Sequence, residues 1–189
     1  IRNQHPPVTR LGLHDLKCAP VDWLKLAEGL SGEASRTAKK TPMQHQTVAI
    51  AAAYEHFKTA ERGKLIMACG TGKTFTSLKI AEKETDSKGI VLFLVPSIAL
   101  LGQTLREWTA DAAHAFNAIC ICSDANVSRK RNQNEDSDGY SVVDIALPAS
   151  TDVQGILKQF ALARHDESHA LTVVFSTYQS IEVIAAAQA

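Results

Sequence analysis

The sequence predicts an α/β fold in which helices cover both faces of a mostly parallel β-sheet. Along residues 41–189, apolar runs of strand length alternate with segments whose apolar residues recur at helical spacing. This alternation is typical of repeated β-α-β units. A glycine turn, Gly70 to Gly72, also stands directly between an expected strand and an expected helix. Apolar residues make up 45% of the 189 residues, which excludes a wholly disordered chain.

The expected strands and helices follow from this alternation. Residues 89–95 form an apolar run without polar interruption, which is typical of a parallel strand covered on both faces. We expect strands at residues 64–68, 89–95, 118–123 and 172–176. We expect helices at residues 44–61, 73–83, 97–113, 152–164 and 180–187, with Ser150 or Thr151 near the start of the fourth. The third helix carries one apolar stripe, formed by Ile98, Leu101, Leu105, Trp108 and Ala112.

The chain is expected to have two parts. Residues 1–40 form a lead-in segment with a short helix at residues 22–30 and a polar linker after it. Residues 41–189 form the folded lobe, with a polar loop at residues 124–141. The first residue is Ile1 rather than Met, so we interpret the sequence as part of a longer chain.

Charge, cysteine content and hydropathy exclude several classes of protein. The sequence has 20 Lys and Arg and 20 Asp and Glu, which excludes a uniformly basic surface for binding nucleic acid. Residues 1–83 carry 13 basic and 7 acidic side chains, so a local basic face remains possible there. The four cysteines lack the spacing of a zinc site. We expect Cys120 and Cys122, which lie in an apolar run, to be buried thiols, and this cysteine usage suits a reducing cytoplasm. The longest apolar stretch spans about twelve residues, short of a membrane span, and no signal peptide is visible.

The strongest candidate for a site is residues 67–74, which read Met-Ala-Cys-Gly-Thr-Gly-Lys-Thr. The glycines let backbone N–H groups turn inward, and the start of the next helix adds partial positive charge, so the segment fits a phosphate-binding loop. Lys73 would reach the β- and γ-phosphates of a nucleotide, and the Thr74 hydroxyl would bind Mg²⁺. A structural glycine turn beside an exposed lysine is the alternative. The residues predicted to surround the phosphates are Cys69, Gly70, Thr71, Gly72, Lys73 and Thr74.

Three other segments carry weaker signals. Gln46 lies about 25 residues before the loop, and its amide could pair with N6 and N7 of adenine; a solvated glutamine is the alternative. Pro96 ends an expected strand, and Ser97 caps the following helix, whose free N–H groups could bind a nucleic-acid phosphate. Tyr178 and neighbouring hydroxyls stand at the carboxyl end of the last strand, where open α/β sheets bind ligands. Ordinary caps and turns are the alternative for these segments.

In this order and spacing, the four segments resemble the Q motif and motifs I, Ia and Ic of superfamily-two helicases and translocases. Residues 67–74, 94–103 and 175–180 are most similar to the translocase segment of single-polypeptide type I restriction-modification enzymes and their predicted-helicase relatives. The resemblance spans about residues 10–189. It implies a RecA-like P-loop NTPase lobe whose sheet is incomplete at its C-terminal end.

The resemblance also implies roles for individual residues. Gln46 would read adenine, and Lys73 and Thr74 would serve catalysis with ATP and Mg²⁺. DNA would run along Pro96, Ser97, Gln103, Thr177 and Tyr178. The sequence departs from the family at two places: Met67 replaces the usual first glycine of the loop, and Gln44-His45 replaces the Arg-Pro that often precedes the glutamine.

An ATP-dependent DNA translocase or helicase is therefore the expected parent protein. Its partners would be double-stranded DNA and the rest of the motor, with nuclease and methyltransferase domains possible on the same polypeptide. The family's next motif, Asp-Glu-Ala-His, and the second lobe with its arginine fingers are missing from the sequence, so we expect the 189 residues alone to be inactive. Two alternatives stay open: a DNA or RNA helicase without a role in restriction, and a non-catalytic ATP-binding module.

Overall fold

The computed structural model describes residues 12–19, 21–29, 36–122, 152–165 and 170–188. The chain divides into two units, residues 1–41 and 42–189. The first unit holds α1 (Leu13–Cys18) and α2 (Trp23–Ala27). The Asp22 carboxylate caps α2 by accepting hydrogen bonds from the N–H groups of the next turn. This helix lies inside the predicted range of residues 22–30.

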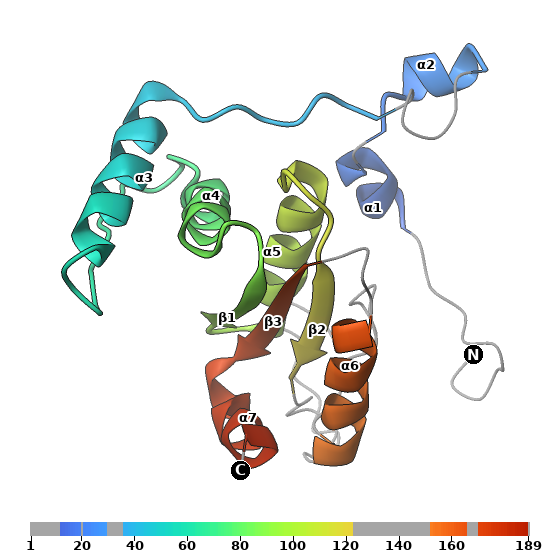
Figure 1. The fold of residues 1–189 in the computed structure, drawn as a ribbon. Helices are drawn as coiled ribbons and strands as arrows, with labels where there is room; N and C mark the ends of the chain where they lie inside the picture. Colours follow the sequence, from blue (N-terminus) through green and yellow to red (C-terminus); the bar gives the residue numbers. More distant parts are fainter. Residues whose placement is uncertain (1–11, 20, 30–35, 123–151, 166–169, 189) are drawn as a thin grey trace, which may run out of the picture. The chain divides into compact units, whose positions relative to one another are not determined.

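The second unit is built on a parallel sheet (Figure 1). Among the described residues, the sheet comprises β1 (Gly89–Val95), β2 (Asn117–Ile121) and β3 (Leu171–Thr177), in the order β1-β3-β2. Both pairings are parallel, with Val95 opposite Thr177 at the carboxyl ends of β1 and β3. All seven residues of β3 are buried, since a neighbouring strand lies on each side. The mostly parallel sheet and three of the four predicted strands are thereby confirmed.

Helices cover both faces of this sheet. On one face, α4 (Lys73–Thr85) and α5 (Ile98–Asp111) pack on Val173 and Phe175 of β3. On the other face, α6 (Val153–His165) and α7 (Ile181–Gln188) pack on Val174. Alternate strand residues point to opposite faces, which is why one strand serves both layers. The remaining helix, α3 (Gln44–Phe57), packs on α4, and a short 3₁₀ turn, η3 (Tyr178–Ser180), precedes α7.

An aromatic cluster joins α5 to the sheet. Trp108 is 1% exposed and meets Phe93 and Phe175 edge-on, with ring centroids 4.9 and 5.6 Å apart. This geometry is favourable for aromatic rings and buries more apolar surface than smaller side chains would. Leu101, Leu105 and Ala112 are also buried. The predicted stripe of residues 97–113 therefore faces the core.

Several predicted helix ends shift in the structure. The helix expected to reach residue 61 ends at Phe57, because the next N–H groups bond back to the Glu55 and His56 carbonyls and tighten the last turn. The Asp152 carboxylate caps α6, bonding the N–H groups of Gln154 and Gly155, whereas Ser150 and Thr151 lie outside the described residues. The predicted loop at residues 124–141 also lies outside them.

Two sequence-based expectations about the sheet are wrong. Residues 64–68 lie outside the described sheet rather than forming a strand, and Leu65 and Ile66 are 47% and 84% exposed. Their apolar character favours extended backbone, but a strand also needs a hydrogen-bonded neighbour, and the described residues supply none there. Likewise β1 lies at the edge of the described sheet, and the described residues leave Ile90 and Leu92 exposed rather than covering the strand on both faces.

The three cysteines whose side chains the structure describes divide into buried and exposed thiols. Cys120 and Cys122 are buried, as predicted, and burial raises the pKa of the Cys120 thiol to about 12, with the nearby Cys122 thiol adding to the rise. Cys69 lies exposed on the glycine turn, within the predicted phosphate-binding loop. Over the described part of the chain, every helix is too short or too polar to cross a membrane.

The unpaired state of residues 64–68 can be tested by amide hydrogen exchange. We expect little protection at Leu65 and Ile66, because backbone N–H groups outside a ladder exchange readily, and strong protection at Val173 and Val174 in the central strand. Exchange followed by mass spectrometry of the 189-residue chain gives both values in one experiment. Equal protection of the two segments would show that residues 64–68 are paired.

Candidate functional site

The glycine turn leads directly into α4. Gly70 and Gly72 both have φ of 76°, and Gly72 is the residue that precedes the first turn of the helix. A residue with a side chain rarely adopts this left-handed conformation. The Gly72 carbonyl accepts hydrogen bonds from the N–H and the hydroxyl of Thr76, at 2.9 and 3.0 Å, which locks the start of α4. The turn and the helix expected from the sequence are thus present.

The Lys73 ammonium lies across this turn. It donates a hydrogen bond to the Ala68 carbonyl at 3.0 Å, and the Thr71 hydroxyl donates to the same carbonyl at 2.7 Å. Lys73 is exposed, so an anionic ligand could reach its ammonium. The turn therefore places a positive charge beside the free N–H groups of a helix start, an arrangement that favours phosphate.

Gln46 on α3 is fixed beside the turn. It is only 6% exposed, its amide oxygen accepts from the Met43 N–H at 2.9 Å, and its amide nitrogen donates to the Thr71 carbonyl at 3.0 Å. An amide group has two donor hydrogens and two acceptor lone pairs, so these bonds leave capacity on both sides for a base. The structure thus brings Gln46 to the predicted loop, from 25 residues away in the sequence.

His45 was not singled out by the sequence reasoning as part of this site. Its Nε2 lies 3.1 Å from the Thr71 carbonyl, which also bonds Gln46. The only signal in the sequence was its place beside Gln46, at a position where the resembling family often has proline. Proline cannot form such a contact, so the way α3 holds the loop differs here.

Thr74 differs from the other hydroxyl residues of the loop and the first turn of α4. The hydroxyls of Thr71, Thr76 and Ser77 each donate to a backbone carbonyl. Within the part of the chain that the structure describes, the Thr74 hydroxyl makes no such bond. Its carbonyl, in contrast, accepts from the Trp108 indole N–H at 3.0 Å and from the Ser77 hydroxyl at 2.8 Å. The Thr74 hydroxyl is therefore available to a ligand.

The predicted DNA-contacting residues lie mostly at the carboxyl ends of two neighbouring strands. Pro96 and Ser97 follow β1, and Tyr178 follows β3, its strand neighbour. The Ser97 hydroxyl accepts from the Leu100 N–H at 3.3 Å, which confirms the predicted cap, and Tyr178 is 55% exposed. Thr177 is different, because it is 2% exposed and its hydroxyl contacts that of Ser180.

Gln103 lies farther along α5, on its exposed side. Its amide donates to the Glu107 carboxylate at 2.8 Å, one helical turn away. The structure therefore forms one group of residues at the glycine turn and another at the strand ends. Thr177 is buried within the second group, and Gln103 lies apart from Ser97 on the same helix.

The two glycines of the turn allow a matched test of its packing. Alanine at either position meets the left-handed backbone, which costs about 1–2 kcal/mol in each case. A Cβ at Gly72 would also overlap the Gln46 amide nitrogen, whereas a Cβ at Gly70 would meet open space. We expect Gly72→Ala to lower the free energy of unfolding by about 1–2 kcal/mol more than Gly70→Ala, because it displaces the Gln46 hydrogen bonds. Equal losses in urea unfolding would contradict this packing.

The fold and these residues can now be compared with known proteins. The family model described as "Type III restriction enzyme, res subunit" matches residues 39–188. A solved structure of the Type ISP restriction-modification enzyme LlaBIII bound to DNA is 38% identical over 100% of this chain, with a TM-score of 0.79. A nuclease-deletion mutant of the Type ISP enzyme LlaGI, in complex with a DNA substrate mimic, is 43% identical over 79% of this chain, with a TM-score of 0.64.

The chain spans only a small part of these enzymes, 12% of the LlaBIII chain and 14% of the LlaGI chain. No curated protein matches the sequence. The match to the family model covers most of the chain and includes the glycine turn, Gln46 and the ends of β1 and β3. The resemblance seen in the motifs is thereby confirmed: the chain belongs to the ResIII family, and it has the fold of the N-terminal part of a helicase motor lobe.

Proposed function

We propose that these residues form the ATP-binding part of the motor of a DNA-translocating restriction-modification enzyme. One observation carries the proposal: a turn with two left-handed glycines opens α4, and the Lys73 ammonium lies across this turn. The first helical turn adds the Thr74 hydroxyl, which bonds none of the described residues. This combination supplies N–H donors, a positive charge and a ligand oxygen within one loop. Those are the groups that a nucleoside triphosphate and its metal ion require.

Each residue of the loop, and Gln46, then has a specific role in binding ATP. Lys73 exchanges its bond to the Ala68 carbonyl for one to a phosphate oxygen, since a charge-assisted bond is the stronger of the two. Gln46 offers its remaining donor and acceptor to adenine. Gly70 and Gly72 keep side chains away from the phosphates, and Cys69 and Thr71 complete the turn.

A magnesium ion fits the Thr74 hydroxyl. Mg²⁺ favours oxygen ligands and usually keeps several water molecules, so a single protein oxygen together with the phosphates is sufficient. Among the described residues, no three His, Cys, Asp or Glu side chains gather into a metal site of their own. The ion would neutralise charge on the phosphates, and Thr74 would fix its place relative to the loop.

DNA would follow the carboxyl ends of β1 and β3. Ser97 leaves N–H groups at the start of α5 for a backbone phosphate, and the exposed Tyr178 ring offers a stacking surface. Pro96 and Thr177 shape the two turns, Thr177 from its buried position, and Gln103 extends the surface along α5. The related LlaBIII enzyme is bound to DNA in its structure.

We further propose that the 189 residues bind ATP without hydrolysing it at a useful rate. The Asp-Glu-Ala-His motif that would activate water in this family is missing from the sequence. One similar run, Asp166-Glu167-Ser168-His169, differs from this motif at its third residue and lies outside the described residues.

Nucleotide binding can be tested with two lysine variants. Lys73→Met removes the ammonium across the turn, and we expect about a tenfold or greater loss of ATP affinity, the size of one charge-assisted hydrogen bond. Lys64→Met is the matched control, because Lys64 is an exposed lysine just before the turn and should leave the affinity within about twofold. Calorimetric titration of ATP with Mg²⁺ gives both affinities. Equal affinity of the Lys73→Met variant and the parent chain would refute the proposal.

The DNA surface can be tested by titration against salt. We expect affinity for double-stranded DNA to fall steeply as salt rises, because phosphate contacts release counterions, with a slope of about −0.9 for each phosphate bound. Tyr178→Ala should weaken binding, whereas Ile181→Ala, which removes another exposed side chain one turn later, should not. A non-catalytic ATP-binding module predicts instead that ATP binds and DNA does not. Fluorescence anisotropy of labelled DNA distinguishes these outcomes.

A further inference from the structure

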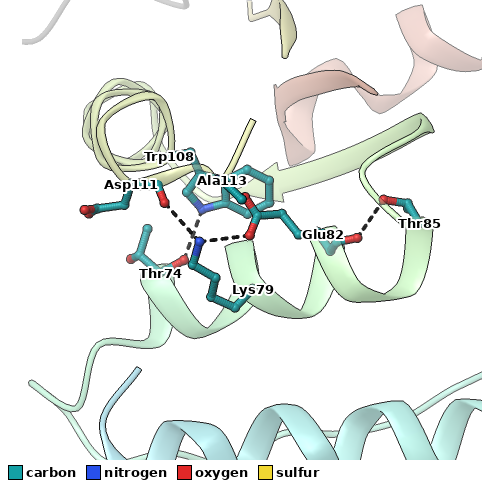
Figure 2. A network of polar contacts seen from close by, with 8 residues as sticks. Thr74, Lys79, Glu82, Thr85, Trp108, Asp111 and Ala113 are labelled. Atoms are coloured by element: carbon teal, nitrogen blue, oxygen red, sulfur yellow. Dashed lines mark hydrogen bonds and ion pairs between the residues drawn. The ribbon is translucent and has the colours of Figure 1, made fainter. Parts of the chain in front are cut away.

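Two sets of hydrogen bonds connect α4 to α5 (Figure 2). At the first turn of α4, the Trp108 indole N–H donates to the Thr74 carbonyl at 3.0 Å. Farther along α4, the Lys79 ammonium bonds the Glu82 carboxylate at 2.9 Å and the Asp111 carbonyl at 3.0 Å. The other Glu82 oxygen accepts from the Ala113 N–H at 2.6 Å. The second set, which we call the Lys79–Glu82 clamp, holds the later part of α4.

The Trp108 indole is a rigid donor. Its ring is 1% exposed and is enclosed by Phe93 and Phe175 of the sheet, at centroid distances of 4.9 and 5.6 Å. Rings packed edge to face at such distances cannot turn without opening the core. Packing against the sheet therefore fixes the position of the indole N–H group, and its hydrogen bond fixes the position of the Thr74 carbonyl.

The acceptor belongs to the residue whose hydroxyl is free for a ligand. The Thr74 carbonyl carbon and the Thr74 side chain are both attached to the same Cα atom. Threonine side chains also adopt only a few staggered rotamers. Fixing the carbonyl thus limits where the hydroxyl can lie. Without that bond, the Thr74 carbonyl would keep only bonds from α4 itself, such as that from the Ser77 hydroxyl, and nothing outside the helix would fix its place.

We propose that Trp108 is a positioning residue that holds the Thr74 hydroxyl at the place where Mg²⁺ binds with the nucleotide. The inference rests on the proposed ATP-binding function and adds a residue from outside the loop to it. Metal ligands need placement within about 0.5 Å, which a helix end held only by local bonds does not guarantee. A buried indole N–H needs some partner in any case, so the decisive question is whether its loss acts on metal binding or on stability alone.

Two substitutions at position 108 remove the bond. Trp108→Phe keeps an aromatic ring but deletes the N–H, and replacement of Trp108 by 3-benzothienylalanine keeps the shape of the indole while sulfur takes the place of the N–H. The second variant decides the question if the first does not fold. Lys79→Met is the matched control, because it breaks the Lys79–Glu82 clamp between the same two helices but leaves the Thr74 carbonyl untouched.

We would measure the affinity of the unsubstituted protein and of each variant for ATP, once with Mg²⁺ and once with EDTA. The midpoint of thermal unfolding would be measured for the same proteins. The ratio of the two affinities reports metal binding, and a purely structural role would lower the midpoint without changing the ratio. We expect both Trp108 variants to reduce the ratio by about three- to tenfold, as for one buried hydrogen bond. Lys79→Met should lower the midpoint and leave the ratio unchanged.

A double substitution tests whether Trp108 acts through Thr74. Thr74→Val removes the hydroxyl with little change of shape and should abolish most of the Mg²⁺ effect. In that background, Trp108→Phe should reduce the ratio no further, since the group that it positions is already gone. An additional loss of the same size would show that Trp108 acts elsewhere and would overturn the proposal.

The remaining outcomes separate this inference from the proposed function. If the intact protein binds ATP more tightly with Mg²⁺, yet the Trp108 variants keep the full ratio, only the positioning role fails. If Thr74→Val also keeps the full ratio, Thr74 is not a metal ligand and the positioning role fails with it. If the intact protein does not bind ATP at all, the proposed function is wrong and the inference is wrong as well.

Discussion

The backbone at Gly72 passes close beneath the Gln46 amide, and this approach fixes the candidate site on one side. It is possible only because Gly72 has no side chain and adopts a φ of 76°. From α3, Gln46 and His45 hold the Thr71 carbonyl. On the other side, Trp108 holds the Thr74 carbonyl. The loop is thereby held at Thr71 and at Thr74, on either side of Gly72 and Lys73.

The central strand β3 packs against the residues that position the loop. All of its residues are buried, and it pairs with both other described strands. Phe175 of β3 packs against Trp108, so the strand helps to place the indole that reaches Thr74. Thr177, two residues later, begins the turn that carries Tyr178. One buried strand therefore underlies both groups of candidate residues, and most of the apolar burial that stabilises the sheet is centred on it.

The polar contacts between α4 and α5 are of two kinds. Lys79 and Glu82 have side chains only 17% and 11% exposed, and each also bonds the backbone of the residues at the end of α5. Removing either partner of such a pair destabilises the fold, because the remaining side chain would be a charged group that is nearly buried and unpaired. Trp108 contributes a single neutral bond, but it acts on Thr74, the residue that we propose as the metal ligand.

Sequence patterns alone determined the elements that depend on local spacing. The apolar stripe of α5, the Ser97 cap, the glycine turn and the three paired strands follow from side-chain periodicity, capping chemistry and the freedom of glycine, all of which act over a few residues. The motifs also indicated the family. The tertiary structure decided whether residues 64–68 join a sheet, that β1 lies at an exposed edge, and that His45 and Trp108 reach the loop. These depend on which segments distant in the chain become neighbours, since a ladder bond, a buried edge or a side-chain contact needs a partner that no local pattern specifies.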